Sequence, residues 1–229
     1  MIVQWTALQA DMRACRECLD AGYDITPGAV FSGPAPAALM LVGQAPGVTE
    51  AEVKRPFNAS SGRRLFQWLA DAGLQEADFR EHYYMTAVTK CYPGKHPKGK
   101  GDRKPSRAEQ KLCRPFLDGE LAMVQPRVLL AVGGLAIETL LGKKMRLDEA
   151  VGHIFDVDGR WVLPLPHPSG ASLWPNLPET KARLRKAMAV LRVELLPLLQ
   201  EGWLPAVALR PDFGSANLIV GVGAPSKIA

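Results

Sequence analysis

Apolar positions along the chain fall into short runs that alternate with stretches of helical periodicity. Residues 37–43 (AALMLVG) and 127–132 (RVLLAV) are short apolar runs bounded by turn residues, which indicates buried strands. Residues 61–72 carry apolar positions at helical spacing and stop at Gly73, and residues 177–199 form a longer amphipathic stretch. Both stretches predict helices. Strands that alternate with helices predict a mostly parallel sheet covered on both faces.

The remaining segments extend this pattern. Ser106 and Glu109 have the spacing of a capping box, which predicts the start of a helix. The other predicted elements are strands at 83–90, 152–157 and 160–165, the last two joined as a hairpin by Asp158-Gly159, and helices at 106–123 and 134–141. We therefore predict a three-layer α/β/α sandwich with a central, mostly parallel four-stranded sheet plus a small hairpin. Residues 1–204 are expected to form a single domain, and residues 205–229 an extension to which the sequence assigns no role.

Three loops follow predicted strands: residues 43–47, 86–91 and 165–169. In open α/β sheets the ligand lies at the carboxyl ends of the strands. These loops should therefore meet at one cleft.

The four cysteines of the chain are Cys15, Cys18, Cys91 and Cys113. A local pair plus two distant thiols is a donor set for an iron-sulfur cluster or a zinc ion. Residues 1–10 lack the basic, apolar and small-residue segments of a secretory signal, which argues against disulfides. Four unrelated buried thiols are the remaining alternative. The spacing alone leaves iron-sulfur and zinc open.

Positive charge is concentrated in one part of the chain. The formal net charge is +5, yet residues 90–114 alone hold nine Lys and Arg against two acidic residues. A basic loop fixed at both ends suits a polyanion backbone, although a solvated surface loop explains it equally well. No apolar stretch approaches the roughly 20 residues that span a bilayer. These features predict a soluble, intracellular protein.

The loops, the cysteines and the basic segment together resemble the uracil-DNA glycosylase superfamily, and most closely its iron-sulfur family 4. The family's Gly-Glu-Ala-Pro-Gly is similar to GQAPG at 43–47, and its second catalytic motif His-Pro-Ser stands at 167–169. Three further segments match in order: RPFNASSG at 55–62, the Ala87-Val88-Thr89-Lys90-Cys91 segment in place of the family's Asn-x-x-Lys-Cys, and CRPFL at 113–117. The resemblance covers residues 15–199.

The resemblance implies a monofunctional uracil-DNA glycosylase of base excision repair. Such an enzyme hydrolyses the N-glycosidic bond of a deaminated base and leaves an abasic site. The alternative is a protein that binds damaged or single-stranded DNA, or cross-links to uracil-containing DNA, with little turnover. The implied cofactor is a [4Fe-4S] cluster on the four cysteines. The implied partner is uracil-containing DNA, single- or double-stranded, bound by a cytoplasmic monomer that associates with the nucleoid and not with a membrane.

The resemblance also implies roles for individual residues. His167 would donate a hydrogen bond to the uracil oxygen that gains charge, and Phe57 would stack on the flipped base. Gln44 would lie near the sugar and its attacking water. Gly43 and Ala45 would line the base pocket. The expected DNA contacts are Ser169, Gly170 and Leu173, with Trp174 as a second wedge candidate, and the basic residues Lys100, Arg103, Lys104 and Arg107.

The chain departs from the family pattern at two positions. Ala87 stands where the family has a base-reading asparagine, so Asn58 is the candidate to replace it, because an amide both donates and accepts hydrogen bonds. Gln44 stands where the family has glutamate, and an amide cannot take a proton from water. We expect Asp102, in the enlarged loop between the last two cysteines, to supply that group, with Glu50 and Glu52 as weaker candidates. His96 in the same loop is the candidate for covalent capture of DNA.

Overall fold

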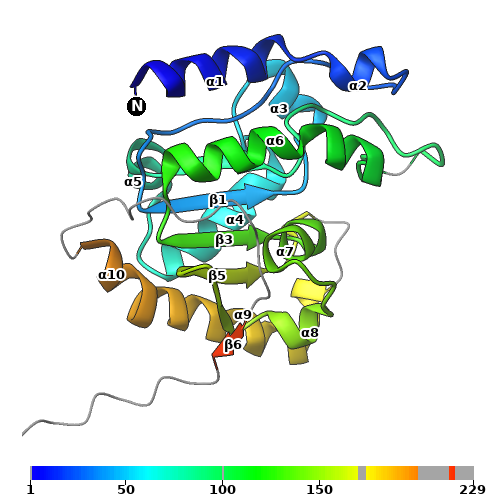
Figure 1. Ribbon diagram of the computed structural model, residues 1–229. Helices are drawn as coiled ribbons and strands as arrows, with labels where there is room; N and C mark the ends of the chain where they lie inside the picture. The colour runs from blue at the N-terminus through cyan, green and yellow to red at the C-terminus, as the bar shows by residue number, and fades with distance from the viewer. Residues whose placement is uncertain (1, 100, 170–173, 201–216, 220–229) are drawn as a thin grey trace, which may run out of the picture.

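A twisted sheet forms the middle layer of the molecule, with helices on both faces (Figure 1). The computed structural model describes residues 2–99, 101–169, 174–200 and 217–219. Within these residues the sheet has six strands in the order β2-β1-β3-β5-β4-β6. The strands are β1 (Leu39–Gly43), β2 (Tyr84–Ala87), β3 (Val128–Val132), β4 (Ile154–Val157), β5 (Arg160–Leu165) and β6 (Asn217–Ile219).

The first four strands of this order are parallel. Strand β4 runs antiparallel to β5, as the predicted hairpin requires, and Asp158 and Gly159 turn between them at φ of 52° and 76°. Strand β6, from the C-terminal extension, pairs antiparallel with β4. The prediction of a parallel four-stranded sheet with a hairpin is confirmed, and the hairpin is part of the same sheet.

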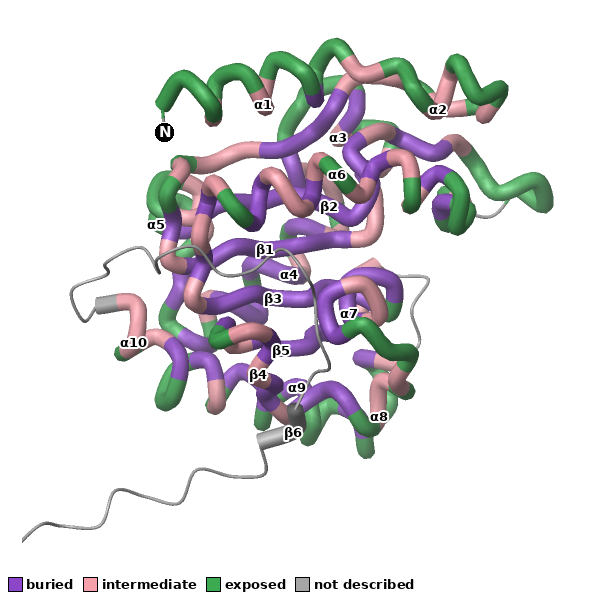
Figure 2. The backbone as a smooth tube through the Cα atoms, viewed as in Figure 1, coloured by how far each residue is buried: buried purple, intermediate pink, exposed green. Residues whose placement is uncertain are grey.

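Each strand sends alternate side chains to opposite faces, so the described residues form two cores. Figure 2 shows β1 and β3 buried along their length. Met40 and Val42 pack with α1, α6 and α7, whereas Leu39 and Leu41 pack with α4, α5 and α9. The helices are α1 (Ile2–Ala14), α2 (Glu17–Asp20), α3 (Val48–Val53), α4 (Ser60–Asp71), α5 (Glu76–His82), α6 (Arg107–Val124), α7 (Gly134–Leu141), α8 (Leu147–Ala150), α9 (Pro178–Val190) and α10 (Leu196–Gln200). A short 3₁₀ helix, η1 (Trp174–Asn176), precedes α9, and a π-helical turn, η2 (Leu191–Leu195), separates α9 from α10.

Most predicted boundaries agree with these elements, and the disagreements have local causes. The Ser106 capping box is confirmed at the start of α6: the Glu109 N–H donates to Ser106 Oγ, and the Ser106 N–H donates to the Glu109 carboxylate. The predicted strand at 83–90 ends early, at Ala87, which pairs with Gly43, the last residue of β1; the Val88 N–H to Gly43 carbonyl hydrogen bond closes this pairing. Helix α1 is not predicted, since among its residues only Met12 is buried. No described helix has the length and apolarity needed to cross a membrane.

The connections of the sheet diverge between β1 and β3. After β1 the chain passes through α4 and α5 on one face of the sheet, whereas after β3 it enters α7 on the other face. Ligands of open α/β sheets bind where neighbouring connections diverge in this way. The carboxyl ends of β1 and β3 are therefore the expected binding edge.

Candidate active site

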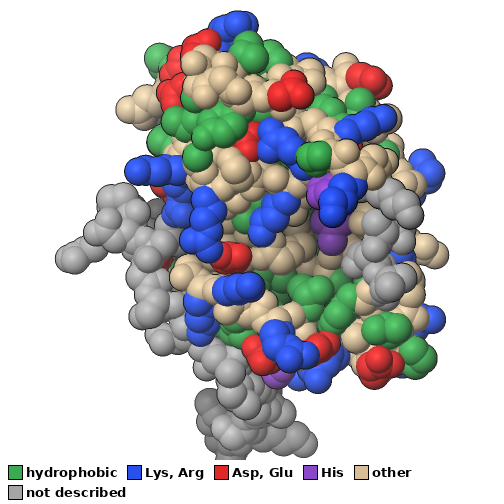
Figure 3. All heavy atoms as spheres, turned by 90° about the vertical axis from the view of Figure 1, so that its right-hand side faces the viewer, with side chains coloured by type: hydrophobic (Ala, Val, Ile, Leu, Met, Phe, Trp, Pro, Cys, Tyr) green, Lys and Arg blue, Asp and Glu red, His purple; other side chains and the backbone are tan. Residues whose placement is uncertain are grey.

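The three loops singled out by the sequence meet at this edge. Gly43 pairs with Ala87 at the ends of β1 and β2, and Val132 pairs with Leu165 at the ends of β3 and β5. The N–H of Val88 donates to the Gly43 carbonyl at 2.9 Å, which joins the first two loops directly. Figure 3 views this side of the molecule and shows histidine side chains with Lys and Arg around them.

Phe57 lies against the end of β1. A Cβ placed on Gly43 would be 3.0 Å from Cζ of the Phe57 ring, so glycine leaves the space that the ring occupies. Phe57 has a φ of 51°, a left-handed conformation that is unfavourable for a bulky residue. Arg80 holds this conformation by donating to the carbonyls of Pro56 and Phe57, both at 3.0 Å.

Glu50 connects the first loop to Phe57. Its carboxylate accepts the N–H of Gly47 at 2.6 Å and also the N–H of Phe57. Burial raises the pKa of Glu50, the two hydrogen bonds oppose this, and the nearby Asp102 charge adds to the increase. The sequence favours Asp102 over Glu50 as the group that handles water. Its spacing from Gly47, at the first turn of α3, is the signal that identifies it, because glutamate at the third position reaches back to the N-cap.

Asp102 returns from the enlarged loop to the same place. The loop folds back on itself through a bridge between Lys95 and Asp102. The Tyr92 hydroxyl donates to Asp102 Oδ1 at 2.9 Å, and a Cβ on Gly47 would lie 3.3 Å from Asp102 Oδ2. An aspartate distant in sequence from the first motif thus stands beside it. His96, in the same loop, is exposed, and its Nδ1 accepts the N–H of Lys98 at 3.2 Å.

His167 lies over the end of β3. A Cβ on Gly133, where φ is +89°, would be 3.1 Å from Cδ2 of the imidazole. The N–H of Ser169 donates to His167 Nδ1 at 3.2 Å, so this nitrogen carries no proton and Nε2 does. Burial lowers the pKa of His167. The ring is therefore a neutral imidazole that donates from Nε2.

The residues expected at the base edge differ in whether they offer a free polar side chain. Ala87 is 6% exposed at the end of β2 and offers no polar side-chain atom. Asn58 directs its amide nitrogen to the carbonyl of Thr49, 3.5 Å away on α3. Gln44 and Ala45 are half-buried, and no described residue hydrogen-bonds the Gln44 amide. Of this group, only Gln44 presents an uncommitted polar side chain at the carboxyl edge of β1.

The basic segment divides into paired and exposed residues. Arg103 forms a two-pronged ion pair with Glu109, at 2.6 and 2.7 Å. Although burial opposes it, this pairing and the Ser106 hydrogen bonds lower the pKa of Glu109 to about 2. Lys104 and Arg107 are exposed, and Arg107 also lies 3.8 Å from the Glu138 carboxylate. Lys100, Gly170 and Leu173 lie outside the described residues, and the Trp174 indole donates to Asp148 at 2.8 Å.

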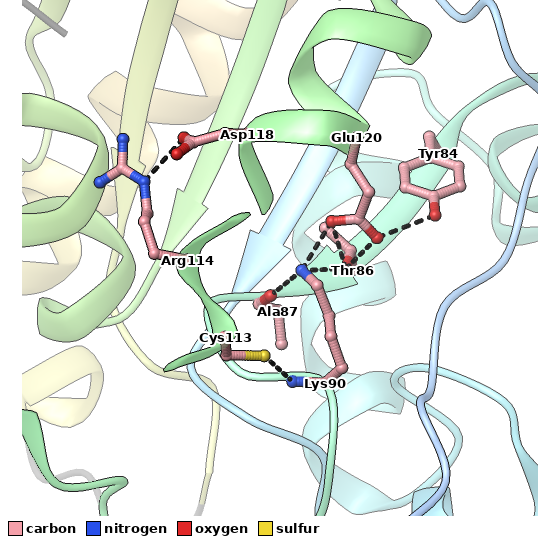
Figure 4. A network of polar contacts seen from close by, with 8 residues as sticks. All are labelled: Tyr84, Thr86, Ala87, Lys90, Cys113, Arg114, Asp118 and Glu120. Carbon is pink, nitrogen blue, oxygen red and sulfur yellow. Dashed lines mark hydrogen bonds and ion pairs between the residues drawn. The ribbon is translucent and has the colours of Figure 1, made fainter. Parts of the chain in front are cut away.

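A buried charged network lies beneath the end of β2 (Figure 4). Lys90 Nζ is 2.6 Å from Glu120 Oε2 on α6, and it also donates to the Ala87 carbonyl at 2.5 Å. Tyr84 and Thr86 donate their hydroxyls to the same carboxylate, each at 2.9 Å. Burial raises the pKa of Glu120 and the Lys90 charge opposes that increase. This network fixes the strand end that carries Ala87.

The four thiols line one cavity between α1, α2, α6 and the loop after β2. None forms a disulfide, which removes that alternative. Cys15, Cys18, Cys91 and Cys113 all contribute to the cavity wall. Among the described residues, no three His, Cys, Asp or Glu side chains are grouped closely enough for a single metal ion. The loop after β2 thus contributes to the binding edge and to the cysteine cavity.

Several donors surround the sulfur atoms. The Lys90 N–H donates to Cys113 Sγ at 3.3 Å, and the Gly28 N–H donates to the Cys91 sulfur. Burial raises the pKa of Cys18 to about 12 and that of Cys113 to about 11, and neighbouring thiols add to both increases. Thiols that repel one another as anions become stable thiolates when a cationic inorganic core lies between them. The donor set therefore fits a thiolate-ligated cluster.

The geometry defines an α/β protein with a neutral imidazole and an aromatic ring near the carboxyl edge of a parallel sheet. Residues 30–192 match the Uracil DNA glycosylase superfamily. The chain belongs to this superfamily.

Similar proteins agree with this assignment. The chain is 32% identical to a type-4 uracil-DNA glycosylase of Thermotoga maritima over 57% of its length and 64% of the relative's. It is 32% identical to one from Pyrobaculum aerophilum, over 53% of this chain and 56% of the relative. It is 28% identical to one from Archaeoglobus fulgidus, over 74% of this chain and 83% of the relative. The chain thus spans less than two thirds of the first two relatives.

Proposed function

We propose that this protein is a uracil-DNA glycosylase that hydrolyses the N-glycosidic bond of uracil in DNA and leaves an abasic site for base excision repair. The observation that carries the proposal is the neutral His167, fixed by Ser169 with its Nε2–H free to donate at the binding edge. Membership of the superfamily and the names of the relatives support the same activity.

The base would bind between Phe57 and His167. Strands β1 and β5 are separated by β3, so the two loops stand about 10 Å apart at strand spacing. That gap accommodates a flipped base with one face on the Phe57 ring. The Nε2–H of His167 would then meet the pyrimidine oxygen that becomes negative as the bond breaks. A neutral donor in a partly desolvated place stabilises this charge as an oxyanion hole does.

The group that handles water would come from the enlarged loop. Gln44 can orient a water but cannot accept its proton. Asp102 lies beside Gly47 with one carboxylate oxygen held by Tyr92, and it is exposed to solvent. We assign Asp102 to the attacking water and to electrostatic support of the cationic sugar. Glu50, whose carboxylate already accepts two backbone N–H groups, positions the loop and Phe57.

The base edge and the DNA backbone involve further residues. Because Ala87 cannot read the base edge, Asn58 or Gln44 must do so after a side-chain rotation, with Gly43 and Ala45 lining the pocket. Ser169 and the exposed Lys104 and Arg107 would contact phosphates. The protein would act as a monomer on uracil-containing DNA in the bacterial cytoplasm, at the nucleoid.

The proposed cofactor is a [4Fe-4S] cluster held by Cys15, Cys18, Cys91 and Cys113. When bound, it supplies a rigid cross-link between α1, α2, α6 and the loop after β2. Cys91 and Cys113 then fix both ends of the segment that contains Asp102. Cys18→Ala should lose iron, fold stability and DNA binding together, as measured by iron analysis, thermal unfolding and DNA titration.

The activity is tested with a labelled oligonucleotide that contains one uracil. Substoichiometric protein followed by alkali should cleave the strand completely at the uracil, and His167→Ala should slow this about 10²–10³-fold. An oligonucleotide with thymine at the same position is the control. Cleavage that never exceeds the amount of protein would refute turnover.

The second candidate function is capture of damaged DNA with little turnover. Ala87 favours it, because this residue offers no polar side-chain atom for reading the base edge, and the exposed His96 would be the nucleophile from the enlarged loop. A protein-DNA species that survives boiling in detergent, and that His96→Ala abolishes, would support this function.

A further inference from the structure

Thr89 lies between the binding edge and the cysteine cavity. Its N–H donates to the carbonyl of Gln44 at 3.3 Å, and the residue also lines the cavity together with the four cysteines. Thr89 is 6% exposed, and its Oγ1 has no hydrogen-bond partner among the described residues. One residue therefore contacts both the first motif and the place of the proposed cofactor.

An unpartnered buried hydroxyl is unusual. Buried polar side chains nearly always have a hydrogen-bond partner, because a buried polar group without one loses its hydrogen bonds to water and gains none in return. Valine would fill the same space without this cost. Two backbone N–H groups already donate to sulfur atoms of this site, from Lys90 to Cys113 and from Gly28 to Cys91. A partner for Thr89 is therefore expected inside the cavity.

We propose that the Thr89 hydroxyl donates a hydrogen bond to a sulfur atom of the [4Fe-4S] cluster, as a third donor beside Lys90 and Gly28. This inference rests on the proposed cofactor and concerns a residue that the cysteine motif does not include. A hydrogen bond to a cluster sulfur stabilises the more negative, reduced state. It therefore raises the reduction potential and slows loss of the cluster.

The test compares Thr89→Val, which keeps the shape and removes the donor, with Thr89→Ser, which keeps the donor. Thr89→Val in the iron-loaded full chain should have a more negative reduction potential and should release iron to a chelator roughly fivefold faster. Thr89→Ser should remain close to wild type in both. Resonance Raman spectra of the wild type in H₂O and D₂O should show isotope-sensitive Fe–S stretching bands, and Thr89→Val should lose part of this sensitivity.

The outcomes are distinct. Unchanged potential and unchanged isotope sensitivity in Thr89→Val would overturn the proposal and indicate that a water molecule satisfies the hydroxyl. If Thr89→Val does not fold, loss of the isotope shift in Thr89→Ala serves the same purpose. Wild-type protein that binds zinc and no iron would overturn the cofactor and this inference together. Uracil excision can then still be measured separately, so failure of the glycosylase proposal is recognised by the gel assay and not by these spectra.

Discussion

The Lys90 ammonium and the Glu120 carboxylate lie 2.6 Å apart with 2% and 0% of their side chains exposed. Both charges depend on each other, because a charge buried without its partner is strongly unfavourable. The pair joins the segment just after β2 to α6, and so fixes the backbone on which Ala87, Thr89 and Cys91 stand.

Glu120→Leu should lower the free energy of unfolding by about 3–5 kcal/mol, because it leaves the Lys90 ammonium buried and unpaired. The measurement is urea unfolding of the iron-loaded protein. The double variant Lys90→Met/Glu120→Leu should lose clearly less free energy of unfolding than the sum of the losses in the two single variants. Strict additivity would show that the two charges are not coupled.

Gly133→Ala should slow uracil excision at least about tenfold, because the new Cβ would stand 3.1 Å from the His167 ring and displace it. Gly134→Ala is the matched control: its Cβ would meet nothing within 4 Å. Single-turnover rates measure the effect. Equal rates for the two variants would show that the position of His167 does not limit catalysis.

Asp102→Asn should reduce the single-turnover rate by about tenfold or more, since the amide keeps the Tyr92 hydrogen bond but cannot accept a proton. Tyr92→Phe removes the hydroxyl and keeps the Asp102 carboxylate, so it should reduce the single-turnover rate by less. The assigned role is wrong if Asp102→Asn stays within about threefold of wild type, roughly 0.7 kcal/mol.

Acid should weaken the fold through Glu109. The pKa of Glu109 is lowered from 4.5 to about 2 in the folded protein. Its contribution to the free energy of unfolding is therefore fully present above pH 4.5 and is lost as the pH falls toward 2. The contribution at neutral pH is about 3 kcal/mol. Urea midpoints should fall more steeply between pH 5 and about pH 3 in wild type than in Glu109→Gln. Parallel profiles would contradict this assignment.

Lys104→Ala should weaken DNA binding and reduce the salt slope of log K by about 0.7–0.9, as expected for loss of one phosphate contact. Arg192→Ala removes the same charge from η2, near α10 and away from the carboxyl edge of the sheet, and should leave the slope unchanged (Figure 1). Arg103→Met should act mainly on stability, because Arg103 is paired with Glu109. Equal salt slopes for Lys104→Ala and wild type would remove Lys104 from the interface.

The sequence predicted the elements whose signal is local. The Ser106–Glu109 capping box, the Asp158-Gly159 turn and helix 134–141 depend on contacts between residues close in the chain, and each is present. Helix α1 was not predicted, because its stability comes from packing one side on α6 and not from its own periodicity.

The sequence by itself determined the central strands β1–β5, the helices α4, α6, α7 and α9, the three strand-end loops and the set of four thiols. Only the tertiary structure decided the partners of the charged groups: Arg103 with Glu109, Lys90 with Glu120, and Glu50 with the N–H groups of Gly47 and Phe57. It also placed Asp102 beside Gly47 and, among the described residues, gave no hydrogen-bond partner to the Oγ1 of Thr89, a residue that lines the cysteine cavity. The reason is physical. Periodicity records which side of an element is buried, whereas a hydrogen-bond partner depends on which distant segments pack together.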